Sequence, residues 1–518
     1  MKARKILLII FFMIFLIIVI NEGTNAQCNC TVPLPPATGT TATVTPAGGI
    51  TAISNAISTA TGPKTIYLTN GTYNFPSGSY VIVSKPDITI RSLSGNRDSV
   101  IINGTGMMSN SGDIHGFQIA KGNCTIADLT IKNIDCHPIQ VNFNTTSDID
   151  NILIHNVHII DGGQQLIKVN VSGTGMFSDY GIIECSLLEY TSSLPSGYWY
   201  TNGIDIQGGT GWIVRDNTFR RIKAAMDQYT AGNSAGPAVL CFKQSSNTLV
   251  ERNTILDCDE GIFFGNWGDV GPSHTGGIIR NNFIRGDIYT RAGIGVSRSP
   301  NALIVNNTIY SPGSNSYQSQ SLTSIEITGM ESNACVIQNN IMNEYVNVLG
   351  GAPAPTQVTN ISTSGSSHYI DPSAVYPAYP DLHLLFGSSA INMGTSHTSR
   401  TLDYDCQTAT STVDIGADEY NGGMTTNINT NQNSITMNIF PNPTSDELNI
   451  SYSLNQSQNV LIELLNVLGE KVILLNQKQF AGDRTFNLHL SELSLNSGVY
   501  FVRLSVEGNS YIQKIVKQ

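Results

Sequence analysis

The stretch Ile213-Val-Arg-Asp-Asn217-Thr-Phe219 decides the fold, because the same short phrase returns four times further along the chain. It consists of two aliphatic residues, two polar residues, an asparagine, Thr or an apolar residue, and a final apolar residue. The later copies begin at Leu249, Ile278, Leu303 and Val336, and their asparagines are Asn253, Asn282, Asn307 and Asn340. Successive asparagines are 25 to 36 residues apart, so the phrase is constant while the period varies. This pattern predicts stacked rungs of fixed cross-section joined by loops of different length.

Each rung contains strands too short to bury an apolar face alone, so the rungs must stack to make a core. An asparagine at a fixed place fits a turn that tolerates left-handed backbone, where side-chain amides form a ladder between rungs. A solenoid of helices would need stretches of about ten residues or more with a 3.6-residue period, and the repeat region has none. The expected fold class is therefore all-β.

One amphipathic helix is predicted at residues 50–60, and a strand and turn follow in Thr65-Ile-Tyr-Leu-Thr-Asn-Gly-Thr-Tyr73. The end of a solenoid needs a cap to hide its apolar cross-section. This helix and strand resemble the N-terminal cap of the pectate-lyase-like right-handed β-helix superfamily, and the resemblance covers about residues 45–345. It implies a right-handed parallel β-helix, a solenoid with an N-terminal helical cap, over residues 27–345.

The first 26 residues are expected to be a cleaved signal peptide. Lys2, Arg4 and Lys5 precede an apolar run over residues 6–20, and residues 21–26 offer a small, polar cleavage site. As a membrane anchor this run would be short, since a spanning helix needs about 20 apolar residues. A lipoprotein signal ending at Cys28 is a second alternative. No further apolar stretch follows, so the mature chain is expected to have no transmembrane segment.

The rest of the chain is expected to divide into three parts. Residues 346–420 are interpreted as the closing end of the β-helix, residues 421–434 as a linker, and residues 435–518 as a small C-terminal β-sandwich. The phrases Phe440-Pro-Asn-Pro443 and Gly498-Val-Tyr-Phe-Val502, with a basic tail, resemble the type IX (Por) secretion sorting domain. The resemblance implies that the type IX secretion machinery exports the chain, which is then secreted or held at the outer cell surface.

Charge and cysteine content limit the partners and cofactors. A net charge of −11 argues against a nucleic-acid partner, because phosphate binding needs a basic footprint. Nine cysteines occur without a C-x-x-C, so no zinc site is expected. Most are expected to be buried thiols, and a Cys124–Cys136 disulfide is permitted by the oxidising export route. A Ca²⁺ site from Asp403, Asp405 and Asp414 is left open, the cofactor is otherwise unknown, and a monomer is expected.

Aligning the rungs on the repeated phrase predicts which side chains share a face. Ile206, Phe242 and Val296 each lie seven residues ahead of the phrase, so they are expected to point inward together. Because strand side chains alternate, their neighbours are expected to point outward: Asp205, Gln207, Cys241, Lys243 and Ser297. A looser alignment places Lys168 and Asn170 outward on the preceding rung. With rungs about 4.8 Å apart, Lys168 is predicted beside Asp205, and Gln207 beside Lys243.

Long insertions flank this patch and contain aromatic and basic residues. Aromatic faces bordered by polar groups suit sugar rings, so the expected partner is a polysaccharide. Together with Asn170 and Gln207, the candidate substrate-binding residues are Trp199, Tyr200, Arg220, Lys223, Tyr229, Trp267 and His274.

The first functional hypothesis is a polysaccharide lyase that cleaves uronic-acid glycans by β-elimination. The reaction needs a base near C5, a cation for the carboxylate and an acid for the leaving oxygen. The candidate base is Lys168 or Lys243. The candidate cation is Arg220, Arg221 or Lys223, and the candidate acid is Tyr229 or His274. Asp205 completes the candidate catalytic set, although a plain ion pair with Lys168 explains it equally well.

Two alternatives stay open. A glycoside hydrolase needs two carboxylates about 5 to 9.5 Å apart, for which Asp205 with Asp227 or Asp259 are the candidates. The paired-Asp and G-H-G phrases of polygalacturonases are absent, so their residue roles are not carried over. A non-catalytic glycan-binding or adhesin-type surface protein would use the same groove without a tuned acid and base.

Overall fold

The computed structural model describes residue 30 and residues 33–518, with gaps at 108–114, 143–147, 172–174, 176, 313–322, 363–365, 374–379, 400–401, 409–411, 421–436, 455–456, 467–470, 481, 494 and 507–508. The expected signal peptide and linker therefore lie outside the described residues. The chain forms two compact units, residues 1–423 and 424–518. No helix among the described residues is long and apolar enough to cross a membrane.

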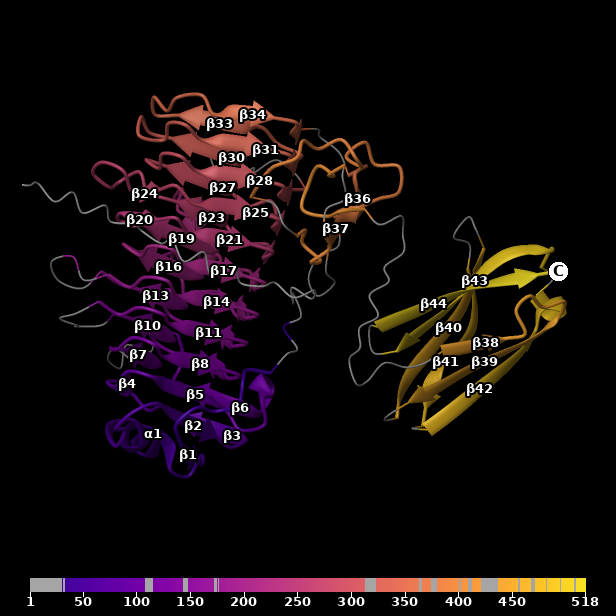
Figure 1. The fold of residues 1–518 in the computed structure, drawn as a ribbon, viewed down its shortest axis with the longest axis horizontal. Coiled ribbons are helices and arrows are strands. Elements are labelled where there is room, and N and C mark those ends of the chain that lie inside the picture. Colours follow the sequence, from indigo (N-terminus) through magenta and orange to yellow (C-terminus); the bar gives the residue numbers. More distant parts are fainter. Residues whose placement is uncertain are drawn as a thin grey trace, which may run out of the picture. The chain divides into compact units, whose positions relative to one another are not determined.

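The first unit is a parallel β-helix in which each rung contributes one strand to each of three long sheets (Figure 1). Sheet A has twelve strands: β1 (Thr40–Val44), β2 (Lys64–Leu68), β5 (Ile88–Ser92), β8 (Thr125–Ala127), β11 (Leu153–His155), β14 (Ile182–Glu184), β17 (Ile213–Arg215), β21 (Leu249–Glu251), β25 (Ile278–Arg280), β28 (Leu303–Val305), β31 (Val336–Gln338) and β34 (Thr356–Val358).

Sheet B has eleven strands: β3 (Gly71–Asn74), β6 (Val100–Asn103), β9 (Thr130–Lys132), β12 (His158–Ile160), β15 (Leu187–Glu189), β18 (Thr218–Arg220), β22 (Thr254–Leu256), β26 (Phe283–Arg285), β29 (Thr308–Tyr310), β32 (Ile341–Met342) and β35 (Ile361–Ser362). Sheet C has ten: β4 (Val81–Val83), β7 (Phe117–Ile119), β10 (Ile139–Val141), β13 (Ile167–Val169), β16 (Ile204–Gln207), β19 (Val239–Phe242), β23 (Glu260–Phe264), β27 (Ala292–Ser297), β30 (Thr323–Thr328) and β33 (Val346–Leu349). A small parallel pair, β20 (Ser245–Ser246) with β24 (His274–Thr275), lies in the turns between sheets C and A.

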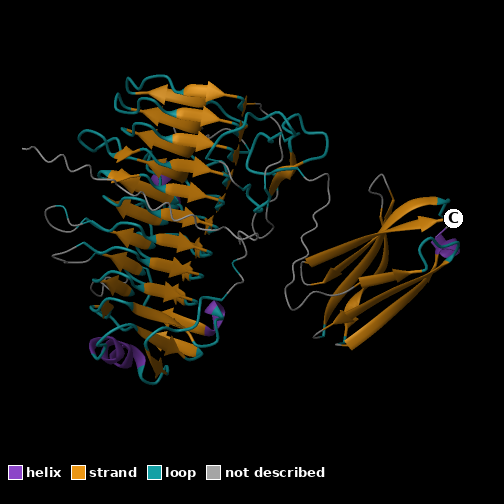
Figure 2. Cartoon of the chain, in the orientation of Figure 1, coloured by secondary structure: helices purple, strands orange, loops and turns teal. Residues whose placement is uncertain are grey.

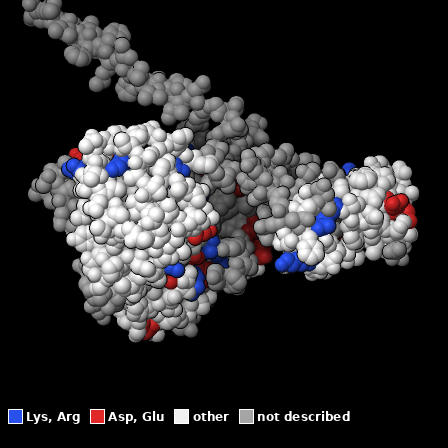
Figure 3. Space-filling model, turned by 90° about the horizontal axis from the view of Figure 1, so that it is seen from below, with Lys and Arg blue, Asp and Glu red and all other residues white. Residues whose placement is uncertain are grey.

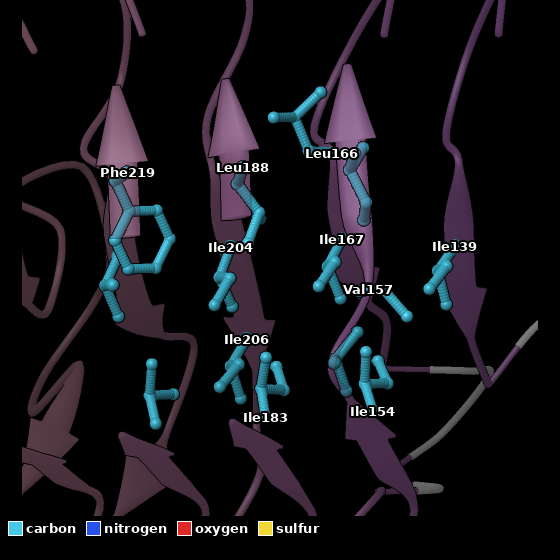
Figure 4. Close-up of a cluster of buried hydrophobic side chains, with 14 of the residues drawn as sticks. Ile139, Ile154, Val157, Leu166, Ile167, Ile183, Leu188, Ile204, Ile206 and Phe219 are labelled. Atoms are coloured by element: carbon cyan, nitrogen blue, oxygen red, sulfur yellow. The ribbon is translucent and has the colours of Figure 1, made fainter. Parts of the chain in front are cut away.

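The strands of the β-helix are two to six residues long, and turns or loops separate them (Figure 2). Their inward side chains form columns of aliphatic residues along the axis (Figure 4). Ile139, Ile167 and Ile204, for example, pair in register on three neighbouring strands and are all fully buried. Each rung therefore completes the apolar core of the next, and the predicted all-β, right-handed parallel β-helix is confirmed.

The predicted amide ladder runs between sheets A and B. Nδ2 of Asn217 donates to Oδ1 of Asn253 over 3.1 Å, and the same bond joins Asn253 to Asn282, Asn282 to Asn307, and Asn307 to Asn340 over 2.9 to 3.0 Å. The left-handed residue, however, is the one before each ladder asparagine, such as Arg252 with a φ of 50°. The ladder asparagines themselves are buried and bond to backbone as well, so they satisfy the polar atoms of the turn.

The first rung is covered by α1 (Gly49–Ser58), as the apolar period of that segment predicts. Ile53, Ala56 and Ile57 are its buried residues and belong to the main core. A short 3-10 helix, η1 (Arg97–Ser99), precedes β6. The end-on view of Figure 3 shows a largely uncharged surface, in keeping with a chain in which only 13% of residues are Asp, Glu, Lys or Arg.

The described residues between 366 and 420 pack against the later rungs through an apolar cluster that includes Phe283, Ile341 and Tyr369. They contain the antiparallel pair β36 (Tyr369–Asp371) and β37 (Asp381–Leu384). The three carboxylates of the open Ca²⁺ prediction have protein partners in this segment, and the Ca²⁺ site stays a prediction. Asp403 and Asp414 accept backbone N–H groups of Gln407, Glu419, Asn392 and Tyr420, whereas Asp405 forms an ion pair with His383.

Cysteine pairing differs from the permitted Cys124–Cys136 bridge. Cys124 and Cys136 are buried thiols, as are Cys241, Cys258 and Cys335. The disulfide instead joins Cys30 to Cys185, with a Cα–Cα distance of 5.3 Å, and Cys406 is also disulfide-bonded. The sequence could not reveal this pairing, because it depends on the path of the segment ahead of the first rung.

The second unit is an antiparallel β-sandwich, as the alternation over residues 435–518 predicts. One sheet contains β38 (Met437–Phe440), β39 (Glu447–Leu454) and β42 (Gly482–His489). The other contains β40 (Gln458–Asn466), β41 (Lys471–Gln479), β43 (Gly498–Val506) and β44 (Asn509–Lys517), and a 3-10 helix η2 (Leu490–Leu493) follows β42. Leu448, Val460 and Val502 are among the buried residues of its separate core.

Candidate functional site

The outer face of sheet C contains a buried ion pair. Lys168 on β13 is directly opposite Asp205 on β16, as the rung alignment predicts. Lys168 Nζ lies 2.9 Å from Asp205 Oδ2, and the two side chains are only 8% and 4% exposed. Burial raises the pKa of Asp205, while Lys168 and the side chains of Gln207 and Lys243 lower it. The pair is held away from bulk solvent, so Lys168 is not positioned as a freely accessible base.

A second, more accessible pair joins Gln207, two residues beyond Asp205 on β16, to Lys243 on the next rung. Lys243 follows β19, and its Nζ donates to Gln207 Oε1 over 3.1 Å, so the predicted neighbourhood is present. The Lys243 side chain is exposed, and its backbone N–H donates to Asp269 over 3.1 Å. A pocket with a volume of 470 Å³ opens here; its lining includes Gln207, Lys243, Asp269, Phe177 and Pro272.

One detail of the rung alignment is wrong. Ile206 pairs with Cys241, not with Phe242, so Cys241 points into the core and is fully buried. The turn after β19 contains two consecutive left-handed residues, Lys243 and Gln244, with φ of 53° and 70°. The turn is one residue longer than the turn after β16. The inward residue that pairs with Ile206 therefore lies eight residues ahead of Leu249, not seven. Phe242 consequently lies on the outer face, beside Gln207.

The outer face continues from the ion pair into an apolar strip that the repeat pattern did not predict. On the next two strands, Leu240 and then Phe263 pair in register with Asp205. Leu240 and Phe263 form a separate apolar cluster with Phe242 and Ala292. Arg291 lies 5.2 Å from the centre of the Phe263 ring and pairs with Glu260 and Glu326. Without the register, these residues carry no periodic signal that separates them from core residues.

Aromatic side chains border this face on the loops at both ends of its strands. Trp199 and Tyr200, on the loop that leads into β16, are 44% and 49% exposed. Trp267, on the loop that leaves β23 and supplies Asp269 to the pocket, is 76% exposed. Asn170 follows β13 at the pocket end of the strand, and its side chain is half-buried.

The predicted basic residues Arg220, Arg221 and Lys223 do not lie at the Lys168–Asp205 pair. Arg220 is on sheet B, where it pairs with Glu189 over 3.3 Å and lines a different pocket, of 530 Å³, together with Arg97 and Cys30. Arg221 is the left-handed residue that follows β18, close enough to Glu189 to lower its pKa. Lys223 is paired with Asp287. The prediction that these cations neutralise a carboxylate at the Lys168–Asp205 patch is therefore corrected.

The two candidate acids lie in the interior. His274 is fully buried, with its ring stacked on Phe264 at 4.1 Å and Nε2 bonded to Thr248. Tyr229, on the short helix α2 (Met226–Tyr229), is 1% exposed and donates to Asp259. Neither side chain is exposed on the outer face of sheet C, so neither supports the proposed role as a substrate contact. Loops have no period, so their sequence could not show which side chains fold inward.

The hydrolase candidates are likewise separated by their environments. Asp259 is fully buried and accepts hydrogen bonds from Tyr229, Ala224 N–H and Ala235 N–H, which fasten the loop between sheets B and C. Asp227 lies at the surface of α2 and bonds to Ser196 and Gly197. Asp205 is neutralised by Lys168. The three carboxylates therefore differ in exposure and in hydrogen-bond partners.

Two groups of side chains have the composition of a metal site. His115, Cys136 and His137 form one group, and His383, Asp405 and Asp418 form the other; within each group the potential ligand atoms lie within 4.8 Å of one another. In the second group, His383 bridges Asp381 at 2.6 Å and Asp405 at 2.9 Å, and these carboxylates raise its pKa to about 11 against the effect of burial. Both of its nitrogens are thus hydrogen-bonded to carboxylates.

Two segments of the chain match known families. Residues 438–518 match the secretion system C-terminal sorting domain, and residues 178–360 match the periplasmic copper-binding protein (NosD) family. The chain therefore carries the sorting domain of the type IX secretion system, and it is secreted or located at the outer cell surface. A search of curated protein sequences found no relative.

Several solved structures are similar in fold. Endopolygalacturonase I from Stereum purpureum, complexed with two galacturonates, is 13% identical and covers 62% of this chain and 100% of its own, with a TM-score of 0.33. The tailspike protein of Escherichia coli bacteriophage HK620, in complex with a pentasaccharide, is 13% identical and covers 85% and 88%, with a TM-score of 0.34. A PL6 family alginate lyase is 15% identical and covers 61% and 51%, with a TM-score of 0.25. At these values the likeness carries no information on activity.

Proposed function

We propose that this exported β-helix binds an extracellular polysaccharide that contains uronic acids, in the groove at the pocket end of sheet C. The observation that carries the proposal is the exposed Lys243 ammonium, held by Gln207 at the edge of a 470 Å³ pocket. An ammonium attracts a carboxylate as a point charge, and the Gln207 amide has groups for a sugar hydroxyl.

The aromatic residues at the strand ends support a long ligand. Trp199 and Tyr200 lie on the loop entering β16, and Trp267 lies on the loop leaving β23. Large exposed aromatic rings are the natural stacking surfaces for sugars, because one face is apolar and the surroundings are polar. A polymer chain can contact several such positions, whereas a single monosaccharide fills only the pocket.

Binding is favoured over cleavage by the state of the charged groups. Lys168 is buried in an ion pair, and Asp269 accepts hydrogen bonds from Lys243 N–H and the Ser273 hydroxyl. Elimination needs a base that reaches the substrate proton directly or through one water. Among the described residues that line the pocket, the titratable side chains are Lys243 and Asp269, and the exposed Lys243 ammonium suits carboxylate recognition.

The test measures binding of the exported chain to alginate, polygalacturonate, chondroitin and a neutral glucan, with the absorbance of unsaturated uronate products followed in parallel. The proposal expects saturable binding to one uronic polymer, weakened about tenfold or more by Lys243→Ala, since a charge-assisted bond contributes about 1.5 to 3 kcal/mol. Lys121→Ala is the matched control, because Lys121 is exposed near the same end of sheet C, beside β7. Equal binding by both variants would refute the groove, and product formation would establish a lyase instead.

A further inference from the structure

His115, Cys136 and His137 meet on two successive rungs, just ahead of sheet C. His115 lies two residues before β7 and His137 two residues before β10, and these strands pair in register. The histidine ring centres are 5.3 Å apart, and the potential ligand atoms of the three residues lie within 4.8 Å of one another. Their exposed fractions are 8%, 6% and 6%, so the group is nearly but not completely closed to solvent.

The hydrogen bonding of His137 fixes which nitrogen faces the group. Nδ1 lies 3.2 Å from the backbone carbonyl oxygen of Gln165. A carbonyl oxygen only accepts, so Nδ1 is the protonated nitrogen and Nε2 carries the lone pair. A histidine that ligates a metal typically donates its other N–H to a backbone carbonyl in this way, which orients the ring and sets its tautomer.

A fourth polar atom lies beside Cys136. The Tyr198 hydroxyl is buried and has no hydrogen-bond partner among the described residues. Burial raises the pKa of this phenol to about 12, and the neighbouring Cys136, Tyr200 and Asp135 act in the same direction. A buried hydroxyl without a partner costs about 1 to 3 kcal/mol, so a ligand at this place would relieve a real penalty.

From this geometry we propose that His115, Cys136 and His137 bind one thiophilic transition-metal ion, Zn²⁺ or Cu⁺, and that the Tyr198 hydroxyl donates to the bound Cys136 sulfur or to a fourth ligand. Two imidazoles and one thiolate are ligands that both ions accept. Metal–ligand bonds of about 2.0 to 2.3 Å hold ligand atoms roughly 3.3 to 3.8 Å apart, so closure needs movements of about 1 Å. The nearby Lys168 is paired with Asp205 over 2.9 Å, and this carboxylate offsets part of its positive charge.

The proposal rests on these residues alone. The family match to copper-binding proteins begins at residue 178 and does not include His115, Cys136 or His137. No zinc site was expected from the sequence because C-x-x-C is absent; the signal that could have found the site is the Cys136-His137 dipeptide with a histidine one rung earlier.

The test uses the full exported chain, freed of metal by a chelator and titrated with Co²⁺. We expect one equivalent to bind and a thiolate-to-cobalt charge-transfer band to appear, which Zn²⁺ abolishes by displacement. Cys136→Ser should remove the band, and His115→Gln and His137→Gln should each weaken Zn²⁺ binding tenfold or more in competition with a chromophoric chelator. Cys335→Ser, which changes another buried thiol, should leave both unchanged.

Stability provides the second readout, in case Cys136→Ser does not fold. Zn²⁺ should raise the melting temperature of the wild-type chain but not that of His115→Gln, because only the native state contains the assembled ligands. The proposal is overturned if the wild type binds no metal saturably, or if loss of binding follows His383→Ala in the second group instead of the changes at residues 115, 136 and 137.

Discussion

The Tyr229 hydroxyl donates to Oδ1 of Asp259 over 2.7 Å, and both side chains are buried under the loop that connects sheets B and C. The other carboxylate oxygen accepts the N–H groups of Ala224 and Ala235, at 2.9 and 2.8 Å. One carboxylate therefore holds both ends of an insertion that contains α2.

This carboxylate should make stability fall as pH rises. Burial raises the pKa of Asp259 from 3.8 to about 7, although its three hydrogen bonds lower it, and burial likewise raises the pKa of Asp403 to about 7 and that of Asp418 to about 6. Because the pKa of each group is higher in the folded state than in the unfolded state, its contribution to the free energy of unfolding is fully present below about pH 4. This contribution is lost as the pH rises from about 4 to about 7. A tenfold difference in the acid dissociation constant between the folded and unfolded states corresponds to about 1.4 kcal/mol.

Urea unfolding at several pH values, followed by tryptophan fluorescence, checks this prediction. All three tryptophans belong to the β-helix unit, so the signal excludes the sandwich. Asp259→Asn should flatten the decline between about pH 4 and pH 7, whereas Asp227→Asn at the surface of the same loop should not. An unchanged slope in Asp259→Asn would show that this carboxylate does not titrate in that window.

The amide ladder should be most sensitive in its middle. Asn282 donates to Val250 O, Arg280 O and Asn307 Oδ1, and its own oxygen accepts from Asn253. Asn282→Ala should lower the free energy of unfolding by about 3 kcal/mol, because several buried polar groups lose their partners. Asn360→Ala, at the half-buried end of the ladder, should cost clearly less. Equal losses in chemical denaturation would contradict a cooperative ladder.

The Lys168–Asp205 pair should behave as a structural element. Lys168→Ala leaves a buried carboxylate without its counter-charge and should destabilise the chain by about 3 to 5 kcal/mol. The double variant Lys168→Met with Asp205→Leu should recover most of this loss. If Lys168→Ala instead abolishes a measured turnover at full stability, the pair is catalytic and the structural interpretation fails.

The Cys30–Cys185 disulfide should stabilise the β-helix strongly, because it closes a loop of 155 residues. Replacing both cysteines by serine should lower the free energy of unfolding by about 2 to 5 kcal/mol. The matched control is Cys335→Ser, a buried thiol outside any disulfide. Thermal or urea unfolding without reductant gives the comparison, and a loss no larger than in the control would contradict the prediction.

The sequence was sufficient for the fold because the asparagine phrase recurs in every rung from Asn217 to Asn340, and each copy pairs with the next. It also predicted that Lys168 lies beside Asp205 and that Gln207 lies beside Lys243. The sequence did not predict the orientation of side chains in the turns and loops. A single extra turn residue at Gln244 moved Phe242 outward, and the insertions turned Tyr229 and His274 into the interior. Loop length and loop packing are set by tertiary contacts, which a local period does not encode.

The order of strand pairing also sets a direction for biosynthesis. In each of the three long sheets, every strand between the two end strands pairs with its counterparts on the preceding and following rungs, and α1 covers the first rung. A chain that emerges N-terminus first can thus add rungs one at a time to a finished template. Cys30 precedes that template in the chain, and its partner Cys185 lies between β14 and β15, so the disulfide can form only after this rung has folded. Formation of the disulfide therefore requires that the rungs between Cys30 and Cys185 have already stacked.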